Sequence, residues 1–77
     1  MNRDELAVIE AQHRVAAIAA DNSRQALRRL RVLARKSLAD STTVDQAAAA
    51  HQRNQTALNQ SRKRLAAAMR RYKEARR

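Results

Sequence analysis

The fold is decided by four residues near the middle of the chain, Asp40-Ser41-Thr42-Thr43. Their side chains hydrogen-bond to nearby backbone groups and prefer helix caps and turns to helix interiors. Thr43 and Gln46 have the spacing of a capping box, in which two side chains three residues apart cap each other's backbone amides. We therefore expect a helix to begin at about Thr43 and a loop to precede it.

The rest of the composition favours helix on both sides of this loop. The 77 residues contain no glycine and no proline, the two residues that most often end helices and form tight turns. Asn2 and Glu5 repeat the capping spacing near the amino end. Asp21-Asn22-Ser23 is the one further place where a break is considered. We predict a single domain over 1–77: a helix at about 3–38, a loop at about 39–42, a helix at about 43–75 and a short basic tail.

Small and apolar residues recur in each predicted helix with the alternating three- and four-residue spacing of a coiled-coil seam. The seam is rich in alanine and includes His13 in the first helix and His51 and Asn54 in the second. A short loop makes the two helices antiparallel, so the sequence predicts an all-α, coiled-coil-like helical hairpin. A loop centred near residue 41 would place residue i level with about residue 82 − i, and Tyr72 near Ile9. The polar seam residues are expected to fix this register.

A second apolar stripe runs along the first helix, away from the seam. A helix that is apolar on two sides is usually buried on two sides. A second copy of the hairpin would cover the stripe and give a homodimeric four-helix bundle. The residues expected on this self-association or partner-helix face are Val8, Val15, Ile18, Ala26 and Leu33.

The chain is strongly basic, with seventeen Lys and Arg against seven Asp and Glu and a formal net charge of +10. The cations gather in two blocks, within 21–39 and 62–77. Four arginines of the first block are spaced by four, three and four residues and therefore share one helix face. We expect an anionic partner to contact a basic surface made of Arg24, Arg28, Arg31, Arg35, Arg62, Lys63, Arg70 and Arg71.

Nucleic acid is the leading partner on this evidence, because arginine contacts phosphate with two donors at once. There is no aromatic platform for single strands, since Tyr72 is the only aromatic residue, and no zinc finger, since cysteine is absent. We expect phosphate contacts on structured RNA or duplex DNA. The alternative is an inhibitor or adaptor, of the kind that phages and mobile elements encode, that docks on an acidic surface of a larger protein or nucleoprotein complex.

Other classes of function find little support. Glu10 and His13 have the Glu-x-x-His spacing of dimetal bundles, and Glu74 is expected near the same level. Neither Glu falls on the seam and arginines crowd that end of the bundle, so we expect no metal. No catalytic triad or phosphate loop can be assembled, so we expect no enzyme, no cofactor and no small-molecule substrate. Charged residues interrupt the amino-terminal stretch, and the longest apolar run is Val15 to Ala20. We expect a cytoplasmic protein without a signal peptide, a membrane span or a membrane partner.

Overall fold

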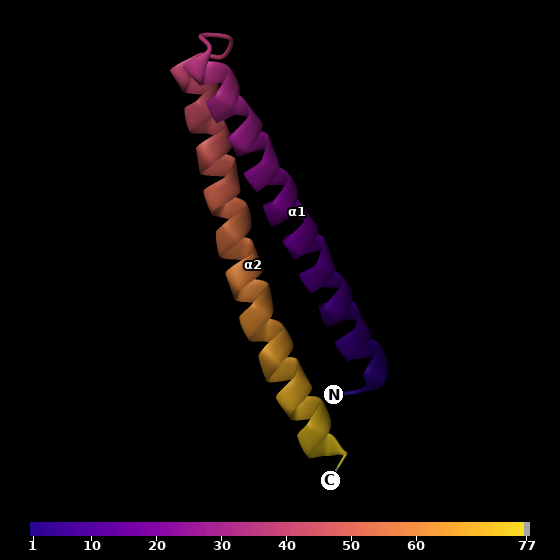
Figure 1. Cartoon of the computed structure of the whole chain (residues 1–77). Helices are drawn as coiled ribbons and strands as arrows, with labels where there is room; N and C mark the ends of the chain where they lie inside the picture. Colours follow the sequence, from indigo (N-terminus) through magenta and orange to yellow (C-terminus); the bar gives the residue numbers. More distant parts are fainter. Residues whose placement is uncertain (77) are drawn as a thin grey trace.

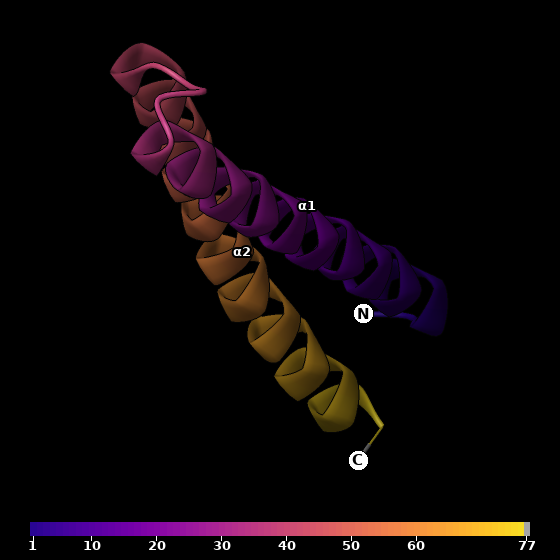
Figure 2. The same cartoon turned by 45° about the horizontal axis from the view of Figure 1, so that its top comes forward.

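The computed structural model describes residues 1–76 and consists of two helices, α1 (Arg3–Arg35) and α2 (Ser41–Ala75). The helices run antiparallel and side by side, with both chain ends at one end of the molecule and the connecting loop at the other (Figure 1). The Cα atoms span 60 × 14 × 12 Å, so the molecule is a rod. Within it the two helices cross at an angle, as the view in Figure 2 shows. The predicted all-α helical hairpin is confirmed.

Both helices begin at a side-chain cap, but only one of the two expected caps is correct. The Asn2 Oδ1 atom accepts the backbone N–H of Glu5 at 2.8 Å, as predicted. At α2 the cap is Asp40, whose Oδ1 atom accepts the backbone N–H of Thr43 at 2.7 Å, so Thr43 is the third helical residue and not the cap. An aspartate is at least as good a cap as a threonine, and this choice adds the polar residues Ser41 and Thr42 to the helix. The Thr43 hydroxyl and amide lower the pKa of the Asp40 carboxyl.

The carboxyl end of α1 lies at Arg35, three residues earlier than predicted. Ser37 adopts a left-handed conformation with φ of 59°, and its N–H bonds to the Ala34 carbonyl at 3.0 Å. The Leu38 N–H then reaches back to the Leu33 carbonyl at 2.9 Å. These two bonds form a Schellman motif, which normally places glycine at the left-handed position. The prediction that the helix extends to residue 38 is therefore wrong. Ser37 takes the left-handed position that glycine usually occupies, and the sequence has no glycine there to mark the end of the helix.

The register between the helices also differs from the prediction. His13 Nδ1 lies 2.9 Å from Ser61 Oγ, and His51 Nδ1 lies 3.0 Å from Ser23 Oγ. Both pairs place residue i of α1 level with residue 74 − i of α2, about one heptad away from the expected 82 − i. The cause is the loop: its centre moves from about residue 41 to residue 38 when α1 ends early and α2 begins early.

The interior of the hairpin is thin. Only four hydrophobic residues are buried among those that the structure describes: Ala20, Leu27, Leu58 and Ala68. Polar bonds cross the seam between them, including one from the Asn54 amide to the Ala19 carbonyl at 3.2 Å. The helix is continuous through Asp21-Asn22-Ser23, where Ser23 Oγ donates to the Ala20 carbonyl at 2.9 Å. His51 and Asn54, which are expected to fix the register, both make polar bonds across the seam.

We predict that Ser37→Gly stabilises the hairpin. Glycine removes the cost of the left-handed conformation, roughly 1 to 2 kcal/mol, and gives back part of that gain as entropy of the unfolded chain. The expected net rise in the free energy of unfolding is about 0.5 to 1 kcal/mol, measured by urea denaturation at fixed protein concentration. Ser37→Ala, which keeps the Cβ atom, is the control and should bring no such gain. A loss of stability in Ser37→Gly would contradict the Schellman geometry.

We also predict that Ser61→Ala destabilises the hairpin by about 1 kcal/mol. The substitution removes the hydrogen-bond partner of the half-buried His13 ring and leaves its Nδ1 atom without one. Thr56→Ala, at an exposed position of the same helix, is the control for helix propensity. Equal stability of the two variants in thermal denaturation would show that the His13–Ser61 bond does not set the register.

Candidate functional site

The arginine row of α1 lines one groove of the hairpin. Arg24, Arg28, Arg31 and Arg35 border a groove of about 280 Å³ whose floor includes Leu27 and whose far wall includes His51 of α2. The row lies on one flank because helical residues three and four apart are neighbours on the surface. The buried Leu27 fixes this flank of α1 beside the seam. The four predicted arginines therefore share a single groove.

A second hollow of about 280 Å³ brings Arg62 from α2 to the same side as Arg24. It is lined by both arginines, by Asp21 and Gln55, and by alanine and leucine residues of the two helices. Arg24 thus lines both hollows and links them. The basic face, as we call it from here on, consists of Arg24, Arg28, Arg31, Arg35 and Arg62.

Little negative charge offsets this face. Arg24 Nη2 lies 2.7 Å from Asp21 Oδ1, and this is the one ion pair within residues 1–76. The other Asp21 oxygen accepts a bond from Gln25 at 2.8 Å. Both partners of the ion pair are well exposed, with side-chain exposures of 66% for Arg24 and 48% for Asp21, so the pair itself is weak. The remaining arginines of the face can bind external anions without first breaking an ion pair.

The other predicted cations do not join the basic face. Arg71 lines a separate hollow with Arg64, Met1, Ile9 and Ala68. Lys63 and Arg70 are exposed, at α2 positions that the seven-residue repeat places opposite α1. The structure therefore divides the eight predicted cations into a group of five on one face and three elsewhere.

His51 belongs to the wall of the basic groove, a position that the sequence reasoning did not assign to it. The single hydroxyl proton of Ser23 is donated to the Ala20 carbonyl, so Ser23 Oγ accepts from His51 Nδ1–H. This bond fixes which nitrogen of the ring, Nδ1, carries the donated hydrogen. His13 makes the same arrangement with Ser61, whose Oγ donates to the Leu58 carbonyl at 3.0 Å.

A repeat of 38 residues was the signal that could have revealed this pairing. The pattern His-x9-Ser-Arg-x2-Leu occurs as His13 to Leu27 and again as His51 to Leu65. The helix caps Asn2 and Asp40 have the same separation of 38 residues. Each half of the repeat supplies one histidine and one serine, and the antiparallel hairpin pairs the histidine of one half with the serine of the other.

The apolar stripe of α1 remains uncovered in the single chain. Val8, Val15 and Ile18 are 57%, 67% and 60% exposed, whereas Leu33 is 38% exposed. Ala26 is half-buried. Leu33 lines a hollow of about 360 Å³ with Arg28, Arg29 and Val32, so the apolar stripe and the arginine row meet at this part of α1.

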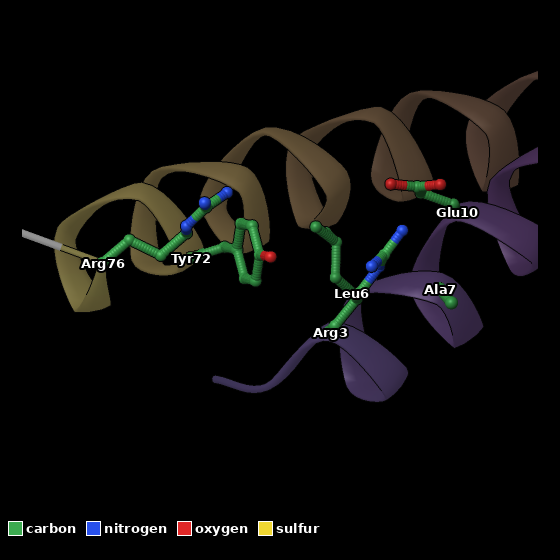
Figure 3. Close-up of a pocket in the computed structure, with 6 residues that line it drawn as sticks. All are labelled: Arg3, Leu6, Ala7, Glu10, Tyr72 and Arg76. Atoms are coloured by element: carbon green, nitrogen blue, oxygen red, sulfur yellow. The ribbon is translucent and has the colours of Figure 1, made fainter.

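A further hollow lies between the helix ends, as Figure 3 shows, and has a volume of about 570 Å³. Leu6 points toward the Tyr72 ring, and Arg76 lies over that ring with its Cζ atom 5.5 Å from the ring centroid. Ile9, the predicted neighbour of Tyr72, lies instead in the hollow with Ala68, as the shifted register requires. Tyr72 is thus held by Arg76 and faces Leu6.

Neither a protein-family model nor a curated protein nor a solved structure matches this chain. Within the part that the structure describes, no three His, Cys, Asp or Glu side chains are placed to hold one metal ion. No described helix is apolar over a length sufficient to cross a membrane.

Proposed function

We propose that this protein binds nucleic acid through phosphate contacts made by its basic face. One observation carries the proposal. Four arginines lie in a row along one groove, and only one of them, Arg24, forms an ion pair, with Asp21. An uncompensated row of guanidinium groups favours a partner with an equally regular row of negative charges. The phosphates of a nucleic acid are such a row.

The dimensions of the row suit this partner. Successive arginines are three or four residues apart, which is about 5 Å along the helix at a rise of 1.5 Å per residue. The row from Arg24 to Arg35 is therefore about 16 Å long, and it can contact several phosphates of one strand, which advance about 3.4 Å each along a duplex. Each guanidinium can donate two parallel bonds to one phosphate.

The chemistry of the groove favours backbone contacts over the recognition of bases. No Phe, Tyr or Trp lines it, so stacking on unpaired bases lacks its usual platform. Its charged groups are the guanidiniums of four arginines, which donate to phosphate oxygens. We expect binding that depends steeply on salt and only weakly on base sequence.

The test replaces Arg24, Arg28, Arg31 and Arg35 together by glutamine. We expect the variant to lose binding to nucleic acid by at least about 100-fold at low salt, because each lost phosphate contact weakens binding at every sequence. Helicity, measured by circular dichroism, should be unchanged, because all four side chains are exposed. Binding is measured by fluorescence anisotropy at two salt concentrations.

The matched control removes the same amount of charge from elsewhere on the rod. It replaces four exposed arginines of α2 by glutamine: Arg53, Arg64, Arg70 and Arg71. The control variant should keep most of the affinity. An equal loss in both variants would show that net charge alone attracts the nucleic acid, and retained affinity in the first variant would exclude the basic face. A stoichiometric acidic protein that survives nuclease treatment in affinity purification would favour the inhibitor or adaptor role instead.

For the apolar stripe of α1 the occupant that we propose is a second copy of the hairpin. Four buried hydrophobic residues are a small core for a chain of this length, and chains of this size usually gain stability by self-association. A standard interface buries about 800 Å² per partner, which is about an eighth of the 6033 Å² surface of this chain. One side of a rod that is 60 Å long offers that area.

We predict that the double substitution Val15→Glu and Ile18→Glu dissociates the dimer. It places two carboxylates of each copy in the middle of the apolar contact, where burial of charge is costly. Sedimentation equilibrium should show the mass of one chain for this variant and of two chains for the natural protein. The control, Ala49→Glu with Thr56→Glu, adds the same charge at exposed positions of α2 and should remain dimeric. A natural protein that sediments as one chain would refute the proposed dimer.

A further inference from the structure

The two halves of the hairpin are related by an approximate twofold axis. Four features of α1 recur in α2 38 residues later. They are the helix cap, the seam histidine, the seam serine and the carbonyl to which that serine donates. Because residue i also lies level with residue 74 − i, the axis passes between Ile18 and Thr56. A rotation that exchanges two antiparallel helices lying side by side must run normal to the plane that contains them. It therefore maps each face of the hairpin onto itself.

The hollow that Arg24 and Arg62 both line lies on this axis, and we call it the central hollow. Its lining contains three pairs of residues that the rotation exchanges: Arg24 with Arg62, Ala20 with Leu58, and Ala17 with Gln55. The two arginines stand six residues to either side of the axis. Their backbones are thus about 18 Å apart along the rod, taking 1.5 Å per residue. Both side chains line the same hollow, so the guanidinium groups flank its centre from opposite sides.

A nucleic-acid duplex carries the same kind of symmetry. Its two backbones are antiparallel and are exchanged by twofold axes normal to the duplex axis, whatever the base sequence, whereas a single strand has a direction and no such axis. Proteins with twofold symmetry commonly bind duplexes with the two axes aligned. The grooves of B-DNA are about 6 and 12 Å wide, so two arginines whose backbones lie about 18 Å apart can reach inward to the strands that border a groove.

We infer that the nucleic acid recognised by the basic face is double-stranded and that Arg24 and Arg62 contact its two strands as equivalent partners across the shared twofold axis. This inference rests on the proposed function. It adds a substrate class, the duplex, and gives Arg62 a positioning role equal to that of Arg24. Arg28, Arg31 and Arg35 extend the contact on one side of the axis. On the other side, the positions that the rotation relates to them hold Ala66, Met69 and Lys73.

Asp21 is the one member of the central hollow that breaks the symmetry of charge. The rotation relates it to Asn59, so Asp21→Asn makes this pair of positions identical. It also frees Arg24 from its 2.7 Å ion pair. We expect Asp21→Asn to bind duplex more tightly than the natural protein, because it removes negative charge that faces the phosphates.

The experiment measures, in the Asp21→Asn background, how much Arg24→Gln and Arg62→Gln each weaken binding. The probes are a DNA duplex of about 20 base pairs, which at 3.4 Å per pair matches the 60 Å rod, an RNA duplex of the same sequence, and each strand alone. We expect a duplex to bind at least about tenfold more tightly than either strand. The two substitutions should weaken duplex binding by the same factor, on the order of three- to tenfold, and each should reduce the dependence of binding on salt by about one phosphate contact.

The controls separate this inference from the proposed function. Arg64→Gln, which removes one charge from the hollow on the other side of α2, should have little effect on duplex binding. If single strands bind as tightly as both duplexes, or if Arg62→Gln has no effect while Arg24→Gln does, the shared axis is refuted and the arginine row remains as a nucleic-acid site. If no probe shows binding that depends on these arginines, the proposed function fails as well. Tighter binding of the DNA or of the RNA duplex identifies which kind of duplex fits the hollow.

Discussion

The register between α1 and α2 is the constraint on which the rest of this structure depends. An alanine-rich seam has few large side chains to oppose sliding, so polar pairs must select one register among several. The two His–Ser bonds, at 2.9 and 3.0 Å, do this at points on either side of the centre of the rod. In the register expected from the sequence, eight residues away, His13 would lie level with Met69 and His51 with Arg31. Both rings would lose their serine partners, which makes that register costly for half-buried groups.

The register in turn determines which charges act together. The arginine row follows from the spacing within α1 alone, but the placement of Arg62 beside Arg24 requires α2 to be at the observed level. The same holds for His51, which enters the wall of the arginine groove because its ring is anchored to Ser23. A basic composition attracts anions without direction. The seam converts that composition into a face with a defined centre and length.

The sequence was sufficient to predict the hairpin, the seam and the shared face of the α1 arginines, because helical periodicity depends only on local spacing. The loop was not predictable to the residue, for two physical reasons. Ser37 takes a left-handed conformation that is usually marked by glycine, and Asp40 and Thr43 compete as caps over a distance of three residues. These errors of two and three residues at the helix ends supply five residues of the eight-residue shift in register, which no local pattern could reveal.

The 38-residue repeat distinguishes what the fold requires from what binding uses. The residues that repeat unchanged are the seam histidine and serine, the arginine that follows the serine, one leucine and two alanines. The histidine and the serine hold the helices in register. The positions farther along the basic face differ: Arg28 and Arg31 in the first half correspond to Ala66 and Met69 in the second. Packing does not demand this difference, since all four side chains are exposed. The arginines beyond the centre therefore give the face a direction, so that a partner aligned on the twofold axis by Arg24 and Arg62 still meets one strongly and one weakly charged half.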